Sequence, residues 1–557
     1  MALFAAGLCT RTWAQSIPDA GSLNREIDRS RLPPSPPKTP PAAVELDVTQ
    51  AKPGGVTVTV TAFRIKGNTL LSDAQVQAVL APFVGKTLDL AGLQTAAAAV
   101  TEAYRHAGWI VSTVLPRQAV EQGVVQLDVV EALLGRVRSA KESSRVPQAL
   151  LSGLVQGGQQ RGQPLNREAV DRGLMLADDL PGVNVAGFLT QGEGERETDV
   201  LLRVADEPMA MGDVTVDNAG SRSTGNVRTA LNLFVNSPLN QGDLLTGMAI
   251  ATRGSEFVRA AFTLPLGFQG LRFGVNTSAL KYRLIAPEFA ALEASGHSQS
   301  VGLESSYPLL RSRQRNVYLS VNLDEKTFLN RASGTVQPRY SAESLTLGIN
   351  GNFFDQLGGG GANTWSLAWI ANTLDLGGSP NQAADAIGPR TDGHAQILRY
   401  SLGRQQSLGS LINDNFSLYA SFSGQWANKN LDSSAKFYLG GVYGVRAYPS
   451  NEGSGAEGQL FNLELRARLP WDAVATAFYD WGHVQNNVDS YVGAPALNSY
   501  SLKGAGLGLS AGVPGGGVLR AVWSHRLGSN PNPTATGKDQ DGTLEKNRFW
   551  FGATFTF

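Results

Sequence analysis

Residues 461–468 read FNLELRAR, so that apolar and polar side chains alternate at every position. Side chains of a β-strand point alternately to its two faces, and this segment therefore has one apolar face and one polar face. Residues 317–324, VYLSVNLD, alternate in the same way. The pattern is typical of a barrel strand with lipid on one side and water on the other.

Helical periodicity is absent from residue 211 onward, where sixteen segments are candidate strands. They begin near Met211, Val227, Leu244, Phe257, Leu271, Ser298, Arg315, Glu343, Asn363, Ala395, Phe416, Gln459, Ala473, Leu502, Gly517 and Arg548. Connections after even-numbered candidates are short, as at 266–270, whereas most connections after odd-numbered ones are long, the longest spanning 428–458. Short turns on one rim and long loops on the other are characteristic of transmembrane barrels. The sequence thus predicts a mainly β chain in which residues 208–557 form a sixteen-stranded antiparallel transmembrane β-barrel.

The front half of the chain repeats one small α+β unit. Residues 56–133 show a strand, two helices and two further strands, and Ser72 followed by Gln75 is a capping-box signature for the first helix. Residues 134–207 repeat the same order. The sequence therefore predicts two small βααββ domains in front of the barrel.

The first 55 residues show no core pattern. Residues 1–14 contain a short apolar run ending before Ala14, which predicts a signal peptide, although a basic n-region is missing. Residues 15–32 could form a polar helix or a solvated tail, and residues 33–55 begin with a proline-rich stretch that predicts an extended linker.

Composition excludes several classes of protein. The net charge is zero and 17% of residues are charged, which does not favour a nucleic-acid partner. Cys9 is the single cysteine, so the chain has no disulfide framework. No segment approaches the roughly 18 consecutive apolar residues of a membrane-spanning helix, so a membrane crossing would need strands.

The sequence shows no catalytic motif. The five histidines are scattered without a His-Glu-x-x-His pattern, and the glycines at 504–508 lie in a candidate strand with no helix after it. Residues 358–361 are glycines without the Lys that a P-loop requires. We therefore predict that the protein is not an enzyme and has neither cofactor nor metal site.

One arginine stands out in the longest predicted loop. Arg446 lies in the segment Val445-Arg446-Ala447-Tyr448, and the alternation of the later strand 478–482 directs Asp480 into the lumen. An Arg–carboxylate pair is strong and directional in a partly dehydrated lumen. The alternative is that Asp480 merely lines a wet pore and that Arg446 is exposed.

Several segments resemble a known family. Residues 63–68 (FRIKGN), 104–109 (YRHAGW) and 129–131 (VVE) resemble polypeptide-transport-associated (POTRA) domains. Together with 216–221 (VDNAGS), 439–441 (LGG), 445–448 (VRAY) and 523–528 (WSHRLG), they resemble the outer-membrane transporters of two-partner secretion, which export haemolysins and filamentous adhesins. Ala447 stands where the family motif carries glycine, and Gly accepts a positive φ more readily than Ala does.

The resemblance implies a location and a function. POTRA domains in the periplasm would recognise an unfolded partner exoprotein with an N-terminal secretion domain, and a pore in the bacterial outer membrane would carry it to the cell surface. Arg446 would be held to the barrel wall by Asp480, at the tip of a loop lodged in the barrel. Residues 15–32 would plug the pore; the residues that we assign to this helix are Leu23, Arg25, Glu26, Ile27, Asp28 and Arg29.

The last segment, 548–557, resembles the C-terminal strand signal of outer-membrane proteins. Phe549, Phe551, Ala553, Phe555 and Phe557 share one face. The resemblance implies outer-membrane lipid as the surroundings and the barrel assembly machinery as a partner during biogenesis. The alternative function is a β-barrel assembly insertase, which shares POTRA domains, a sixteen-stranded barrel and the arginine loop; a passive porin would not need the front domains.

Overall fold

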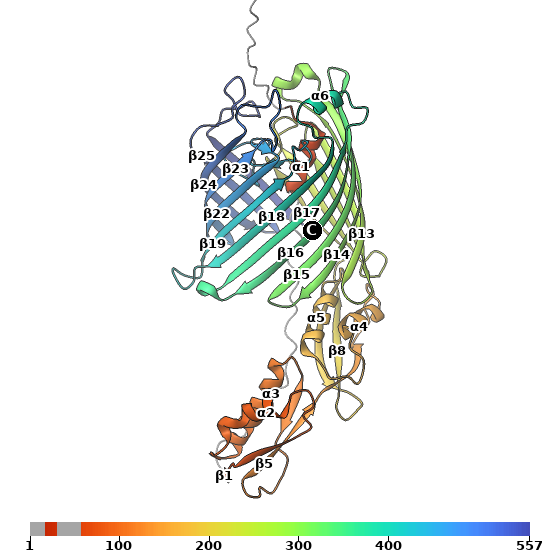
Figure 1. Ribbon diagram of the computed structural model, residues 1–557, viewed down its shortest axis with the longest axis vertical. Coiled ribbons are helices and arrows are strands. Elements are labelled where there is room, and N and C mark those ends of the chain that lie inside the picture. The colour runs from red at the N-terminus through yellow and green to blue at the C-terminus, as the bar shows by residue number, and fades with distance from the viewer. Residues whose placement is uncertain (1–16, 31–56) are drawn as a thin grey trace, which may run out of the picture.

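The structure is a computed structural model that describes residues 17–30 and 57–557. Its largest part is a closed antiparallel barrel of sixteen strands, below which two small α+β modules hang (Figure 1). The predicted fold class is confirmed. The predicted signal peptide 1–14 and linker 33–55 lie outside the described residues.

The barrel strands follow one another around the wall in chain order, and the last pairs with the first. They are β9 (Ala210–Asp217), β10 (Arg228–Asn236), β11 (Leu244–Ala251), β12 (Ser255–Leu266), β13 (Leu271–Arg283), β14 (Ser295–Arg311), β15 (Arg315–Ala332), β16 (Thr335–Asp355), β17 (Gly361–Asp375), β18 (Gly393–Ser407), β19 (Phe416–Ala427), β22 (Glu457–Leu469), β23 (Ala473–Gln485), β24 (Ser499–Val513), β25 (Gly517–Arg526) and β26 (Asn547–Thr556).

The alternation predicted for the strands is present in the barrel wall. On β15, Leu319 and Leu323 are exposed on the outer face, whereas Asn322 and Asp324 face the lumen. One expectation was wrong: β16 begins at Thr335, not near Glu343, because a two-residue turn joins it to β15. The connection between β15 and β16 is therefore short, although it follows an odd-numbered strand.

The rim next to the two modules, the lower rim in Figure 1, carries short turns, and the opposite, upper rim carries most of the long loops. The longest loop joins β19 to β22; it is the sixth connection on the upper rim, and we call it loop 6. It contains β20 (Phe437–Tyr438) and β21 (Ser454–Gly455), which pair with each other. The other loop elements are α6 (Gln382–Ile387), η2 (Pro287–Leu292) and, at the lower rim, η3 (Leu357–Gly359).

The first module packs two helices on a three-stranded sheet of order β2-β5-β4. Its elements are β1 (Val58–Thr59), β2 (Ala62–Lys66), α2 (Asp73–Leu80), η1 (Ala81–Phe83), β3 (Thr87–Leu88), α3 (Leu90–His106), β4 (Val111–Val114) and β5 (Val124–Glu131). The capping box of Ser72 and Gln75 is present at α2. The single first strand expected from residue 56 is instead split, because β1 pairs with β3 while β2 pairs with β5.

The second module has the same order of elements and a sheet of order β6-β8-β7. Its elements are β6 (Leu133–Ser139), α4 (Gln148–Gln156), α5 (Arg167–Asp178), β7 (Val183–Gln191) and β8 (Glu197–Asp206). The strand β6 begins one residue before the boundary proposed from the sequence. Backbone hydrogen bonds join the modules, including Leu165 N to Ala132 O at 2.8 Å and Arg167 N to Gly108 O at 2.8 Å.

The second module docks on the lower rim through two charge pairs and a hydrogen bond to the backbone. Arg311, at the end of β14, is 2% exposed and donates from Nε and Nη2 to the two carboxylate oxygens of Asp179, at 2.7 and 2.9 Å. Arg313 pairs with Asp171 of α5 at 3.1 Å, and Arg172 donates to the backbone oxygen of Pro308. These contacts fix the module to the turns of the barrel.

The helix α1 (Ala20–Ser30) lies inside the barrel, far from the first module that follows it in the chain (Figure 1). It begins at Ala20, within the segment 15–32 that was expected to form a helix, because Asp19 accepts a hydrogen bond from Ser22 N and so caps the first turn. Among the described residues, no helix is long and apolar enough to cross a membrane.

Candidate functional site in the barrel lumen

The structure brings Arg446 and Asp480 together inside the barrel. Asp480, on β23, is fully buried, and its two oxygens accept from Arg446 Nε at 2.9 Å and Nη2 at 2.7 Å. The backbone N–H of Arg446 donates to the same carboxylate at 3.0 Å. Loop 6 is thus attached to the wall by both the side chain and the backbone of one residue.

Further wall residues complete the surroundings of Arg446. Glu464 of β22 accepts from Nη1 at 2.8 Å, and the guanidinium lies 3.5 Å from the centre of the Phe478 ring. The carbonyl oxygen of Arg446 accepts from Ser524 Oγ and from Trp550 Nε1, at 2.8 and 2.9 Å. Sequence reasoning missed Glu464, although the alternation of residues 461–468 already placed it on the polar face.

The other residues of the loop motif are buried beside this pair. Val445, Ala447 and Tyr448 are 0%, 0% and 1% exposed. Ala447 does not adopt a positive φ, so alanine fits the backbone at this position. Its methyl group packs against Gly504 of β24, where a Cβ would lie 2.7 Å from it, so the glycine makes room for the loop.

The motif is also connected to the last upper loop. The guanidinium carbon of Arg526 lies 4.3 Å from the centre of the Tyr448 ring. Arg526 also forms a buried ion pair with Asp539. Glu452 of loop 6 accepts from Asn530 Nδ2 and from the backbone N–H of Gln540, both at 2.8 Å. Loop 6 is therefore held by the C-terminal strands and by the loop between β25 and β26.

The helix α1 lies against the opposite wall. Ala20 N donates to Asn330 Oδ1 at 2.9 Å, Asn24 donates to Ser298, and Asp28 pairs with Lys326 at 3.7 Å. Residues at i, i+4 and i+8 share one face of a helix. Ser298 stands opposite Phe328 in the β14–β15 ladder, halfway between Asn330 and Lys326 on β15. The three wall partners of α1 are therefore evenly spaced down the wall and match the spacing of one helix face.

Loop 6 covers the other side of α1. Arg25 Nε donates to the backbone oxygen of Lys436 at 3.2 Å, and Arg29 Nη1 donates to that of Gly440 at 3.1 Å. Ser433 donates to Asp19 at 2.7 Å. The helix is thus held between the wall and the loop that carries Arg446.

Apolar contacts also hold α1 against the wall. Leu23 and Ile27 are 4% and 9% exposed and belong to one buried cluster with wall side chains. These wall residues include Phe257, Leu280, Phe328, Tyr340 and Leu374. Glu26 points away from this cluster, toward Ser450 of loop 6 and Arg228 of β10.

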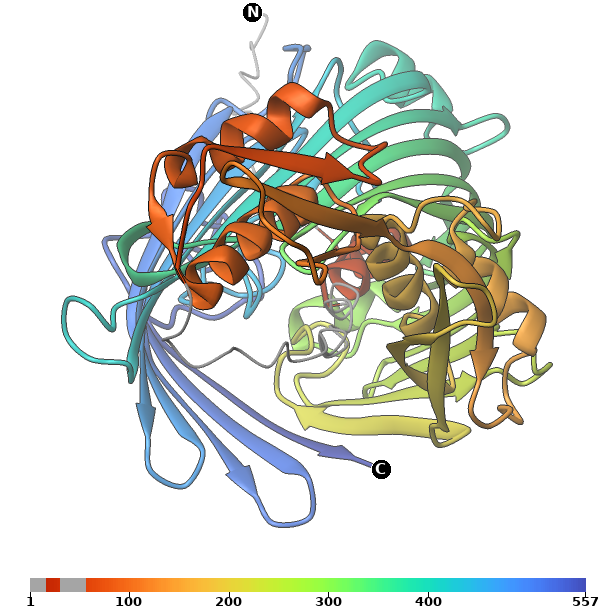
Figure 2. The same cartoon turned by 90° about the horizontal axis from the view of Figure 1, so that it is seen from below.

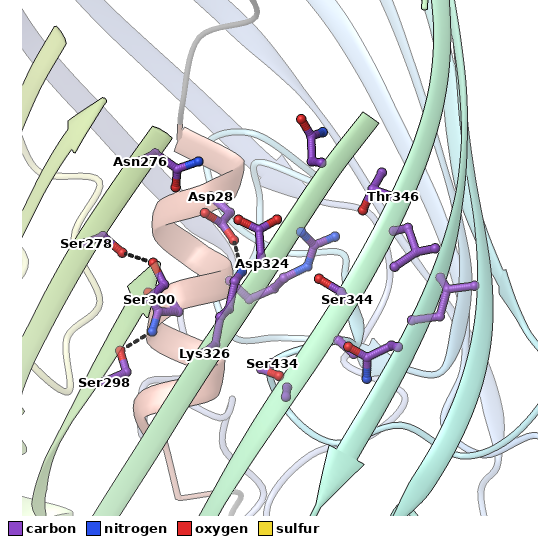
Figure 3. Close-up of a pocket in the computed structure, with 18 of the residues that line it drawn as sticks. Asp28, Asn276, Ser278, Ser298, Ser300, Asp324, Lys326, Ser344, Thr346 and Ser434 are labelled. Carbon is purple, nitrogen blue, oxygen red and sulfur yellow. Dashed lines mark hydrogen bonds and ion pairs between the residues drawn. The ribbon is translucent and has the colours of Figure 1, made fainter. Parts of the chain in front are cut away.

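A polar cavity of about 380 Å³ remains between α1 and strands β12–β18 (Figure 3). Figure 3 shows Asp28 of α1 paired with Lys326 of the wall, and a hydrogen bond between Ser278 and Ser300 on the wall. Asp324 also lines the cavity. Charged side chains of both signs therefore line this part of the lumen, and α1 occupies the space beside them.

The family of the chain can be decided from comparison with known proteins. A family model described as haemolysin secretion/activation protein ShlB/FhaC/HecB matches residues 196–511, which is more than half of the chain. The chain belongs to this family. A second model, the ShlB-type POTRA domain, matches residues 58–132, the first module.

Two transporters are among the known proteins to which this chain is similar. The heme/hemopexin transporter protein HuxB of Haemophilus influenzae (strain 86-028NP) is 26% identical, with 97% of this chain and 95% of HuxB aligned. The outer membrane transporter CdiB of Dickeya dadantii (strain 3937) is 24% identical, with 78% and 77% aligned.

The solved structure of CdiB from Escherichia coli has a TM-score of 0.71 to this chain, covering 92% of this chain and 93% of that one at 22% identity. This likeness shows a shared fold. As in other members of the ShlB/FhaC/HecB family, the barrel lies in the outer membrane and the POTRA modules lie in the periplasm. The lower rim is therefore periplasmic and the upper rim extracellular.

Proposed function

We propose that this member of the ShlB/FhaC/HecB family exports a partner exoprotein through its own barrel, with α1 as the plug and the Arg446–Asp480 pair as the lock of loop 6. The observation that carries the proposal is that both bodies fill the lumen and contact each other. Arg25 and Arg29 of α1 donate to backbone oxygens of loop 6, so departure of the helix frees groups of the loop.

The POTRA modules provide edges on which an extended segment can add. Among the strands of residues 17–30 and 57–557, β4 pairs only with β5 and β7 pairs only with β8, so each leaves one edge of its sheet open. Strand addition to such edges uses backbone hydrogen bonds and therefore suits unfolded chains of varied sequence. We infer that the N-terminal secretion domain of the partner binds here.

The plug accounts for the closed resting lumen. Its polar residues face the aqueous cavity and loop 6, while Leu23 and Ile27 bind an apolar part of the wall. The Asp28–Lys326 contact is long, at 3.7 Å, and both side chains are partly exposed, which suits a helix that leaves during export.

The partner exoprotein is identified by a secretion experiment in the native host. Mass spectrometry of the culture supernatant, with and without this gene product, should show loss of one large protein while other outer-membrane barrels are unchanged. The name of HuxB makes a haem- or hemopexin-binding exoprotein the first candidate to examine. An unchanged supernatant would contradict dedicated export.

A second candidate function, barrel insertion, has one observation in its favour. The ladder of β26 with β9 runs only from Gly552–Asp217 to Thr556–Asp213, whereas that of β25 with β26 runs from Gly517–Phe555 to His525–Asn547. The β26–β9 pairing closes the barrel, and we call it the seam. A seam with few paired residues can open sideways toward lipid. Broad loss of other barrels from the outer membrane would support this function.

Locking the seam separates the two functions. Thr215 and Thr554 stand opposite each other across it, with their hydroxyl oxygens 2.9 Å apart. A Thr215→Cys/Thr554→Cys disulfide should leave export through the lumen intact, and reduction should change nothing. Export that requires reduction would show that lateral opening is part of the mechanism. The single native cysteine, Cys9, falls in the predicted signal peptide, so it would not interfere in the mature chain.

We also infer that β26 is read by the barrel assembly machinery during biogenesis. Phe549, Phe551, Phe555 and Phe557 are all about half exposed or more on its outer face. Replacing Phe557 with serine should slow assembly and leave more unfolded precursor. A matched Phe273→Ser change on β13, whose ring is also exposed on the outer face, should have little effect.

A further inference from the structure

A groove of about 320 Å³ lies on the outer surface of the barrel, away from the lumen. Its lining is mainly aromatic and aliphatic and comes from five consecutive strands of the wall. The aromatic and aliphatic residues of the lining are Phe353 of β16, Trp365 of β17, Leu402 of β18, Ala420 and Phe422 of β19, and Phe461 of β22.

The strand register explains why a hollow forms at this place. Leu402 stands opposite both Trp365 and Phe422, and Phe422 stands opposite Phe461, so these four side chains form one row across the wall. The ring of Trp365 lies over Gly351, which has no side chain to lift it. Ala420 lies two residues before Phe422 on β19, one row closer to the periplasm. Its small side chain leaves a space below the row of Trp365, Leu402, Phe422 and Phe461.

The groove opens toward lipid and not toward water. Leu402 and Phe353 are 58% and 39% exposed, and their strand neighbours of opposite parity, such as Arg399 of β18, line the lumen. Within the membrane, the molecules that meet an outward-facing apolar groove are lipids.

The periplasmic end of the groove is polar. Arg404 of β18 lines it and forms a two-point pair with Asp355, at 2.6 and 3.0 Å, and also donates to Asn363. The guanidinium of Arg404 lies over Gly361, the first residue of β17, at the periplasmic end of the wall. Long basic side chains often extend in this way toward the lipid headgroups. Leu357 and Leu411, on the two turns below, are 72% and 77% exposed.

We propose that this groove binds one phospholipid of the periplasmic leaflet, with an acyl chain against Leu402 and Ala420 and the headgroup beside the Arg404–Asp355 pair. The second POTRA module covers other turns of this rim, those next to β13–β15, so it leaves this sector open to the membrane (Figure 2). Asp355 neutralises Arg404 and, together with Asn363 and Gln406, accepts its hydrogen bonds, so apolar contact rather than headgroup charge holds the lipid.

Native mass spectrometry of the full chain, extracted in mild detergent, tests the proposal by counting retained phospholipids. Ala420→Phe fills the groove, and Leu402→Trp fills it from a second position if the first variant assembles poorly. Each should remove one retained phospholipid per barrel. The matched control is Ala260→Phe, an exposed alanine on the lipid side of β12. Equal retention in all variants, or equal loss in the control, would overturn the site.

Reconstitution with defined lipids tests the role of charge. Nanodiscs of phosphatidylethanolamine and of phosphatidylglycerol should give the same retention to within about threefold, since a neutral ion pair does not select an anion. A preference of about tenfold or more for phosphatidylglycerol would show that the headgroup charge is recognised and would contradict the proposal in this form.

Discussion

Asp480 and Arg446 form a two-point ion pair in which the carboxylate is fully buried and both of its oxygens are occupied. Asp480 belongs to the rigid wall, whereas Arg446 belongs to a long loop that comes from the extracellular rim. The pair therefore decides where the loop tip rests in the pore. Glu464 and the ring of Phe478 add a second carboxylate and a cation–π contact on the same guanidinium.

We expect Arg446→Ala to reduce export strongly while the barrel still assembles. Removing one partner of a buried pair costs about 3–5 kcal/mol, and each 1.4 kcal/mol changes the occupancy of the docked loop about tenfold. Secretion of the partner and heat-modifiable migration on gels measure the two effects. Arg446→Lys should also be impaired, because lysine cannot make the two-point contact. Normal secretion by Arg446→Ala would remove the pair from the mechanism.

Glu464 and Asp480 should differ in importance. Glu464→Ala leaves Arg446 with Asp480, whereas Asp480→Ala removes three hydrogen bonds of Arg446 and leaves its single hydrogen bond to Glu464. The same secretion assay should rank the defects Arg446→Ala, Asp480→Ala and Glu464→Ala in descending order. A Glu464 defect as large as that of Asp480 would contradict this ranking.

Leu23→Asp should open the pore. The substitution places a carboxylate in the apolar cluster of the wall, and an unpaired buried charge costs several kcal/mol. The helix should therefore leave the lumen more often, and single-channel recordings in planar bilayers should show higher conductance. Ile17→Asp is the matched control, because Ile17 is 50% exposed and precedes the helix. Deleting residues 20–30 should give the upper limit of conductance.

Asp179→Ala should loosen the second POTRA module more than Arg311→Met does. The first change leaves Arg311 buried without its carboxylate, which costs about 3–5 kcal/mol, whereas the second removes the charge itself. Distance distributions between spin labels on the module and the barrel should broaden accordingly. Asp171→Ala, which affects a pair about a quarter exposed, should cost under about 1 kcal/mol.

Glu131 should make the first POTRA module sensitive to acid. Burial opposes its ionisation, but hydrogen bonds from Thr69, Leu70 and Tyr104 outweigh it and hold the pKa of Glu131 below its ordinary value. Since the folded pKa is the lower one, this stabilisation is present above the unfolded pKa of about 4.3 and is lost as pH falls through the folded pKa.

Hydrogen exchange at the amides of Thr69 and Leu70 measures this effect. Their protection factors should be high at neutral pH and fall in acid for the wild-type chain. In Glu131→Gln they should be lower at neutral pH and nearly independent of pH. Protection factors that do not change with pH in the wild-type chain would show that the ionised Glu131 carboxylate does not stabilise the segment of Thr69 and Leu70.

The sequence by itself determined the barrel and its faces. Strand alternation has a period of two, so each side chain of FNLELRAR or of residues 478–482 is assigned to lipid or lumen from local order alone. The start of β16 was misplaced, because a two-residue turn leaves almost no loop signal between two strands. The repeat of the βααββ units and the capping box of α2 are local patterns too, and they were also predictable.

Only the tertiary structure decided which distant groups meet. Arg311 and Asp179 are 132 residues apart, and Trp550 and Arg446 are 104 apart, so neither contact leaves a trace in local periodicity. The register of α1 on Asn330, Ser298 and Lys326 depends on how the strands are staggered around the closed barrel. Alternation fixes the side of the wall on which a residue lies, but closure and stagger decide its height and its partners.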